Sequence, residues 1–167
     1  MNTQETQPEL PNTRPDFMAD TTIRVLPVPP DMIEPMWPYI SVPLAKGMDV
    51  DPDFDFDRSA KLVMEGLTQV WAVWKGPHVI AAFCTTFLND ADNPGELAMD
   101  IHGMGGEGLN EWVELVSELM VEWATANKAK RIIFRGRKAL ARAYAPLGPF
   151  TIRKTDEHGD CLFEREL

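Results

Sequence analysis

The sequence has few residues of the kinds that build disulfide frameworks or metal sites. It contains two cysteines in 167 residues, Cys84 and Cys161, with no CxxC spacing. We expect both to be small core residues of a protein in a reducing compartment. The three histidines, His78, His102 and His158, form no H-x-x-x-H pair. A metal site is therefore not predicted.

Long apolar runs are also missing. The longest, residues 79–84, is far shorter than the roughly 20 residues that a membrane-spanning helix needs. The N-terminal residues are polar and lack the apolar core of a signal peptide. We therefore expect a cytoplasmic protein with no membrane partner. With 44% apolar and 25% charged residues, the composition is that of an ordinary globular domain.

Positive charge is scarce over most of the chain. Residues 1–128 carry 21 acidic and 7 basic residues, whereas residues 129–167 carry 5 acidic and 9 basic ones, for a total of −10. A nucleic-acid partner needs a surface that neutralises phosphates, so direct nucleic-acid binding is not expected. The basic C-terminal part can serve one small anionic ligand, or it is simply a solvated surface.

The chain divides into a polar arm and one domain. Residues 1–20 contain Pro8, Pro11 and Pro15 and are expected to be extended or disordered. Residues 21–167 alternate between strand-like and helix-like patterns. The predicted strands are 21–28, 68–74, 79–88, 96–101, 131–135, 151–154 and 161–166, and the predicted helices begin at 31 and cover 57–65, 109–127 and 138–145. This order predicts an α/β (α+β) fold with a mixed central sheet of about seven strands and about four flanking helices.

Two helices carry further expectations. Pro35 and Pro38 should make the first helix short or kinked. Residues 109–127 show the clearest pattern, an apolar stripe at three- and four-residue steps. Its members are Leu109, Trp112, Val113, Val116, Leu119, Met120 and Trp123.

Five aspartates fall between residues 49 and 57. An EF-hand loop starting at Asp49 would need glycine and glutamate where Phe54 and Ala60 stand. We therefore interpret these carboxylates as the acidic N-terminal cap of the helix that follows, rather than as a calcium site.

The stretch Ile101-His102-Gly103-Met104-Gly105-Gly106-Glu107-Gly108 precedes the amphipathic helix. A glycine-rich turn at a helix N-terminus presents backbone N–H groups and the positive end of the helix dipole, which together bind phosphate. The alternative is that the glycines only make a sharp strand-to-helix turn.

The order of elements, with a glycine turn before the third helix, resembles the GCN5-related N-acetyltransferase (GNAT) fold over residues 21–167. The family's pyrophosphate loop reads Q/R-x-x-G-x-G/A. Gly106 and Gly108 match it, while Gly103 stands where Gln or Arg is expected. The resemblance implies acetyl-CoA or another acyl-CoA in the gap between strands 96–101 and 131–135. The residues expected to bind it are Gly103, Gly105, Gly106, Gly108 and Leu109 at the pyrophosphate, and Arg135, Arg137, Lys138 or Arg142 at the 3′-phosphate.

A second partial match lies at residues 141–148. GNAT enzymes often carry A-x-x-x-Y-x-x-x-G-F there, and Tyr144 and Gly148 fit this spacing, with Pro149 inserted before Phe150. The resemblance implies that Tyr144 protonates the coenzyme A thiolate, which suits a phenol with a pKa near ~10. The alternative is a tyrosine ring that only packs on the sheet.

The amine acceptor also needs a base. Glu96, Asp100 and His102 share one face of strand 96–101 by the two-residue period of a strand. His102 titrates in the right range. Each of the three can equally be an ordinary strand residue.

Within the fold, the chain is similar to small acetyltransferase-like proteins of tailed bacteriophages, through VWAVW at 70–74, GLNEW at 108–112 and RGR at 135–137. Two functions follow from this resemblance. One is an N-acyltransferase in the host cytoplasm, with an amine or lysine acceptor attracted by the acidic N-terminal part. The other is an inactive GNAT-fold component of a virion, bound to a phage or host protein through residues 1–20. An acidic mimic of nucleic acid fits the charge, but not the amphipathic core or the basic C-terminal part.

Overall fold

The computed structural model describes residues 20–47, 56–138 and 141–167. The expectations for the N-terminal arm and for the capping aspartates of residues 49–55 lie outside the described residues. The strands are β1 (Ile23–Pro27), β2 (Gln69–Lys75), β3 (His78–Asn89), β4 (Leu97–Gly106), β5 (Arg131–Arg137), β6 (Thr151–Thr155) and β7 (Asp160–Glu166). The helices are α1 (Ile33–Gly47), α2 (Phe56–Met64), α3 (Leu109–Ala126) and α4 (Ala141–Tyr144), with 3₁₀ turns η1 (Pro30–Met32) and η3 (Ala145–Leu147).

All seven strands form one sheet in the order β1-β2-β3-β4-β5-β7-β6. Neighbouring strands are antiparallel except for β4 and β5, which are parallel and are joined through α3. A parallel pair needs such a crossover connection. The predicted fold class, a mixed sheet flanked by helices, is confirmed.

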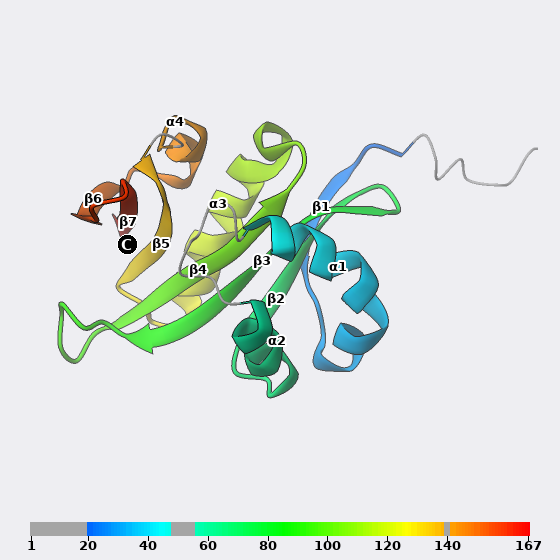
Figure 1. Cartoon of the computed structure of the whole chain (residues 1–167), viewed down its shortest axis with the longest axis horizontal. Helices are drawn as coiled ribbons and strands as arrows, with labels where there is room; N and C mark the ends of the chain where they lie inside the picture. The colour runs from blue at the N-terminus through cyan, green and yellow to red at the C-terminus, as the bar shows by residue number, and fades with distance from the viewer. Residues whose placement is uncertain (1–19, 48–55, 139–140) are drawn as a thin grey trace, which may run out of the picture.

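Helices cover the two faces of the sheet (Figure 1). Alternation along β2 divides its side chains between the two faces of the sheet. Trp71 and Val73 join the core under α3, and Val70 and Ala72 join a second core that includes Ile40 of α1. Burial of both faces explains why β2 is apolar along most of its length.

Helix α1 is longer than its prolines predict. It runs through Pro38 and Pro43 to Gly47, because its inner side is buried on the sheet through Ile40 and Leu44. Burial of an apolar helix face can offset the hydrogen bonds that a proline removes. Of the two expected outcomes, a short helix or a kinked one, the short helix is therefore wrong.

Two other elements have different bounds in the structure from those predicted from the sequence. Strand β4 continues five residues past Ile101, to Gly106, so most of the predicted glycine turn is strand. The predicted helix 138–145 is only the four-residue α4 followed by η3 within the described residues. Both changes alter the site described below.

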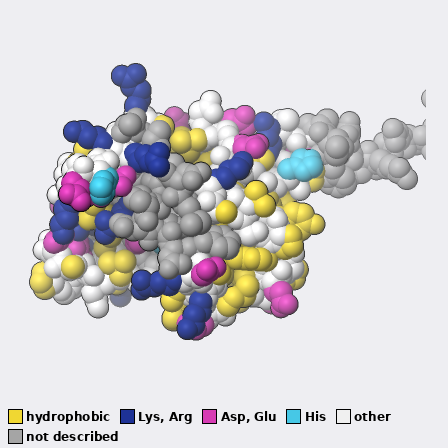
Figure 2. Space-filling view, viewed as in Figure 1, with side chains coloured by type: hydrophobic (Ala, Val, Ile, Leu, Met, Phe, Trp, Pro, Cys, Tyr) yellow, Lys and Arg dark blue, Asp and Glu magenta, His cyan; other side chains and the backbone are white. Residues whose placement is uncertain are grey.

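The surface charge follows the division seen in the sequence. Lys and Arg side chains gather mainly over the C-terminal elements, and apolar side chains are visible over α1 and α2 (Figure 2). No helix in the described part of the chain is long and apolar enough to cross a membrane. Across the same residues, no cluster of three His, Cys, Asp or Glu side chains is placed to bind a metal ion.

Candidate functional site

The sheet opens between β4 and β5. Their register pairs only Ala98–Ile101 with Arg131–Phe134. Beyond these pairs both strands continue, β4 to Gly106 and β5 to Arg137, without facing each other. The strands therefore diverge, as Figure 1 shows. Two cavities lie along this opening.

A bulge marks the divergent part of β4. Cys84 pairs with His102 and Ala82 pairs with Gly105, so Gly103 and Met104 stand opposite one residue of β3. Gly103 has φ 64°, in the left-handed region that glycine adopts without strain. The extra residue shifts the alternation, and Met104 consequently packs with the core under α3.

Gly105 is required by helix packing. A Cβ at this position would overlap the Pro43 carbonyl oxygen and would lie 2.5 Å from the Gly47 nitrogen. The last turn of α1 therefore rests directly on the backbone of β4. This contact corrects the interpretation of the glycines as one open phosphate loop, since this face of Gly105 is covered by α1.

Only Glu107 and Gly108 link β4 to α3. Gly108 is the N-cap of α3 with φ 65° and supplies no side-chain cap to the first-turn amides. The Glu111 N–H donates to the Gly108 carbonyl at 2.8 Å, but no side chain caps the first turn, and together with the helix dipole this favours an anion here. Two carboxylates lie nearby, and each has a lysine partner, Lys46 at 3.4 Å from Glu107 and Lys75 at 2.9 Å from Glu111.

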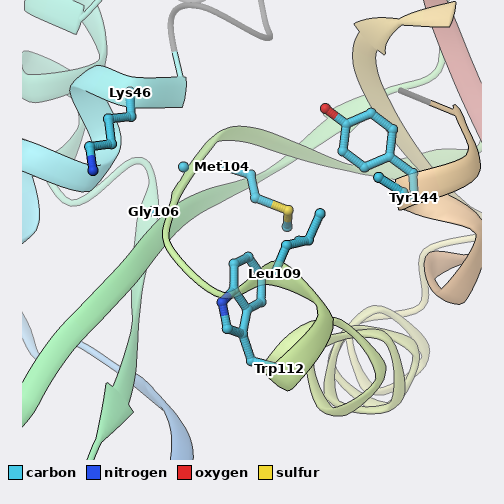
Figure 3. A pocket seen from close by; sticks show the side chains of 8 residues that line it. Lys46, Met104, Gly106, Leu109, Trp112 and Tyr144 are labelled. Atoms are coloured by element: carbon cyan, nitrogen blue, oxygen red, sulfur yellow. The ribbon is translucent and has the colours of Figure 1, made fainter. Parts of the chain in front are cut away.

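The larger cavity, of about 170 Å³, lies beside this helix start. Lys46 on α1 lies at one edge of the cavity and Tyr144 on α4 at the other, with apolar side chains between them (Figure 3). Of the described residues that line the cavity, Lys46 alone has a charged side chain. The lining is Lys46, Met104, Gly105, Gly106, Leu109, Trp112, Ala143 and Tyr144.

Sequence reasoning missed Lys46, Met104 and Trp112 as lining residues. Met104 lies among the glycines, where nothing in the sequence indicates a contact with a ligand. Trp112 belongs to the apolar stripe of α3, which predicts a core position. The bulge and the short link are what turn them toward the cavity. Lys46 had no sequence signal, because its place depends on the contact of α1 with β4.

Tyr144 is buried at the wall shared by both cavities. Its ring packs edge-to-face on Phe134, with centroids 5.5 Å apart, and lies against Gly136, where a Cβ would approach the ring to 2.9 Å. Gly136 therefore leaves room for the phenol beside β5. The ring packing expected as the alternative is present.

The smaller cavity, of about 20 Å³, lies in the opening itself. His102 lines it from β4 and Arg135 from β5, together with Tyr144. Nε2 of His102 lies 2.9 Å from Oγ1 of Thr86. Burial lowers the pKa of His102 to about 4, since a charged ring loses its hydration there. The imidazole is therefore neutral at pH 7, and the expectation that His102 titrates in the ordinary range of a histidine is wrong, because burial makes it a weaker base.

The other two proposed bases lie farther along β4. Asp100 is opposite Thr86 on the face that His102 shares. Glu96 precedes β4 and forms an ion pair with Arg131. Six residues of extended chain, about 20 Å, separate Glu96 from His102. The structure brings His102 and Tyr144 to one cavity and leaves Glu96 outside it.

The predicted phosphate-binding cations are also spread out. Arg135 lines the smaller cavity, Arg137 is exposed at the end of β5, and Arg142 is exposed on α4. Leu109 lines the larger cavity with Gly105 and Gly106. Lys138 is exposed directly after β5.

The arrangement of strands and helices is that of the GNAT acetyltransferases. No family model matches the sequence. No curated protein matches it either. The similarity is found in three-dimensional structure.

Three solved structures illustrate the similarity. An N-acetyltransferase from Staphylococcus aureus Mu50 superposes with a TM-score of 0.61 at 12% identity, covering 87% of this chain and 97% of that one. A Bacillus subtilis acetyltransferase in complex with CoA gives a TM-score of 0.59 at 10% identity, covering 87% and 99%. The GNAT domain of S. lividans PAT gives a TM-score of 0.60 at 15% identity, covering 87% of this chain and 90% of that one. At these identities the comparison establishes the fold.

Proposed function

We propose that this protein is an acyl-CoA-dependent N-acyltransferase. The observation that carries the proposal is the opening between β4 and β5, with His102 and Tyr144 lining one cavity within it. A neutral base and a phenolic acid on the walls of one opening are the two groups that acyl transfer to an amine needs. A GNAT-fold relative bound to CoA makes the same ligand class reasonable here.

The residues present suit an acyl-CoA. Its pyrophosphate would be held by the uncapped first-turn amides of α3, next to Lys46. Its apolar arm would lie in the larger cavity, against Met104, Leu109 and Trp112. The bound acyl-CoA would supply an activated acyl group as a thioester.

The chain itself would position the reactants and move protons. His102 is neutral and can accept a proton from the attacking amine. Tyr144 can donate its hydroxyl proton to the departing thiolate sulfur. Direct attack within one closed site depends chiefly on orientation, which the rigid strand β4 and the buried Tyr144 ring provide.

Calorimetric titration with acetyl-CoA tests the proposal. The wild-type chain should bind, and Gly108→Asp should abolish binding, since it puts a carboxylate at the start of α3. Gly159→Asp is the matched control, because Gly159 also has a positive φ (80°) and open surroundings but lies in the turn between β6 and β7. No heat and no thermal stabilisation of the wild-type chain at millimolar acetyl-CoA would refute the proposal.

One observation favours a second function. Glu107 and Glu111 place two carboxylates beside the start of α3, where they oppose a bound phosphate. An inactive GNAT-fold component of a bacteriophage virion, held to its neighbours by residues 1–20, is consistent with this charge. Deleting residues 1–20 would then impair assembly and leave the domain folded, and normal incorporation of the shortened chain would contradict it.

A further inference from the structure

A chain of hydrogen bonds leads away from His102 across the sheet. Nε2 of His102 on β4 lies 2.9 Å from Oγ1 of Thr86 on β3. The same Thr86 oxygen lies 2.9 Å from Oγ1 of Thr68, just before β2. Three side chains on neighbouring strands thus form a continuous hydroxyl–imidazole path (strand order in Figure 1).

The path ends at a third cavity. Thr68 lines a space of about 250 Å³ between the start of β2, the end of β3 and the end of α3. Its walls include polar side chains of Gln69, Thr85 and Asn127, and Trp123 adds an indole N–H that has no partner among the described residues. A cavity of this size with polar walls holds water, at ~30 Å³ per molecule in the liquid.

Burial disfavours the protonated, positively charged form of the His102 imidazole. The groups beside it are Thr86 and Cys84 on β3, Asp100 on β4, Arg135 on β5 and Tyr144 on α4. Burial also raises the pKa of the Cys84 thiol to about 12, so this neighbour carries no charge. A buried imidazolium is costly in such surroundings. A proton that His102 accepts must therefore be passed on to another group.

We propose that Thr86 and Thr68 relay the proton of the attacking amine from His102 across the sheet to the water beside Thr68. The inference rests on the proposed function. As the N–H bond of the amine breaks, an Nδ1–H bond forms on His102 and its Nε2 proton passes to Thr86. The hydroxyl proton of Thr86 passes to Thr68, and that of Thr68 passes to water. Each oxygen gains one proton and loses one, so the two threonines are unchanged positioning residues. His102 also gains one and loses one and is left as the Nδ1–H tautomer. Loss of the Nδ1 proton to solvent and return of a proton to Nε2 through Thr86 reset it before the next turnover.

Thr86→Val tests the relay, because it removes the hydroxyl and keeps the β-branched shape that suits a strand. With acetyl-CoA and a panel of primary amines, kcat should fall about tenfold or more while KM for acetyl-CoA stays the same. Thr86→Ser should restore kcat. Thr151→Val on the exposed edge strand β6 is the matched control and should leave kcat unchanged. Thr68→Val breaks the path one bond farther from the imidazole and should also lower kcat.

Two further readouts separate a relay from a purely structural role. In mixtures of H₂O and D₂O, wild-type kcat should show a curved proton inventory, and Thr86→Val should make it linear. Imidazole ¹⁵N spectra should show His102 protonated at Nε2 in the wild type and a shifted tautomer balance in Thr86→Val, with no substrate needed.

The possible failures are distinct. Absence of acetyl-CoA binding by the wild-type chain overturns the proposed function, and with it the proton transfer. An active wild type whose Thr86→Val and Thr68→Val variants keep kcat within twofold overturns the relay alone. Unchanged His102 spectra in Thr86→Val also overturn it.

Discussion

Removing one oxygen atom from Tyr144 separates its chemistry from its packing. In Tyr144→Phe the ring keeps its edge-to-face contacts with Phe134 and Phe163, at 5.5 and 6.1 Å between centroids, and its place beside Gly136. Only the hydroxyl is lost. The variant should therefore fold and should bind acetyl-CoA with an unchanged Kd.

The expected magnitudes differ sharply for stability and for rate. Losing one hydroxyl should lower the free energy of unfolding by about 0.5–1.5 kcal/mol. Losing a general acid should lower kcat by about 10²-fold or more. By contrast, Tyr144→Ala would also empty the space beside Phe134 and cost about 3–5 kcal/mol, which is why phenylalanine is the informative substitution.

The assay follows the release of free thiol from acetyl-CoA with a primary amine, alongside thermal unfolding. The chain offers one matched control, since its only other tyrosine, Tyr39, is 65% exposed on α1. Tyr39→Phe should leave both kcat and stability unchanged. A Tyr144→Phe variant with kcat within about threefold of the wild type would refute the assignment of Tyr144 as the acid.

Two further predictions concern stability. Gly105→Ala should destabilise the fold by about 1–3 kcal/mol in urea unfolding, because its Cβ overlaps the Pro43 carbonyl of α1; an unchanged midpoint would contradict this contact. Burial alone would raise the pKa of Asp90, but hydrogen bonds, chiefly from Arg153 and Asn93, outweigh it and lower the pKa. The stability that Asp90 contributes is therefore present above its unfolded pKa of ~3.9 and is lost as pH falls through the lower folded value. Asp90→Asn should reduce stability at pH 7 and flatten the fall between about pH 4 and 2 in a series of urea titrations, and parallel curves would contradict it.

Much of the fold could be predicted because the strands and α3 are encoded by local periodicity. The apolar stripe of α3 buries Trp112, Val113, Val116 and Met120 as expected. The alternation of β2 likewise sends its side chains to two separate cores. Such patterns reflect which face is buried, and burial is what the sheet and the helix supply.

The glycine stretch could not be resolved by local rules. Glycine normally ends a strand, but β4 continues through Gly103 and Gly105, because a bulge and the last turn of α1 require glycine there. The contact of β4 with α1 joins chain segments more than fifty residues apart, and the bulge depends on the pairing of β4 with β3. For the same reason sequence reasoning missed Lys46 as a lining residue, since its position follows from the docking of α1. The roles expected of His102 and Tyr144 stay predictions.

The diverging strands also have a mechanical consequence. Among the described residues, strand pairing between the β1–β4 part of the sheet and the β5–β7–β6 part covers only Ala98–Ile101 against Arg131–Phe134, with one further hydrogen bond from the Lys130 N–H to the Leu97 carbonyl. A molecule held in the opening touches β4 on one side and Tyr144 on the other, so it bridges two parts of the sheet that share few hydrogen bonds. Ligand binding would thus hold the two parts of the sheet together and stabilise the part that is less well paired. Amide exchange in β5 and β7 should therefore slow more than in β1 and β2 when the opening is filled.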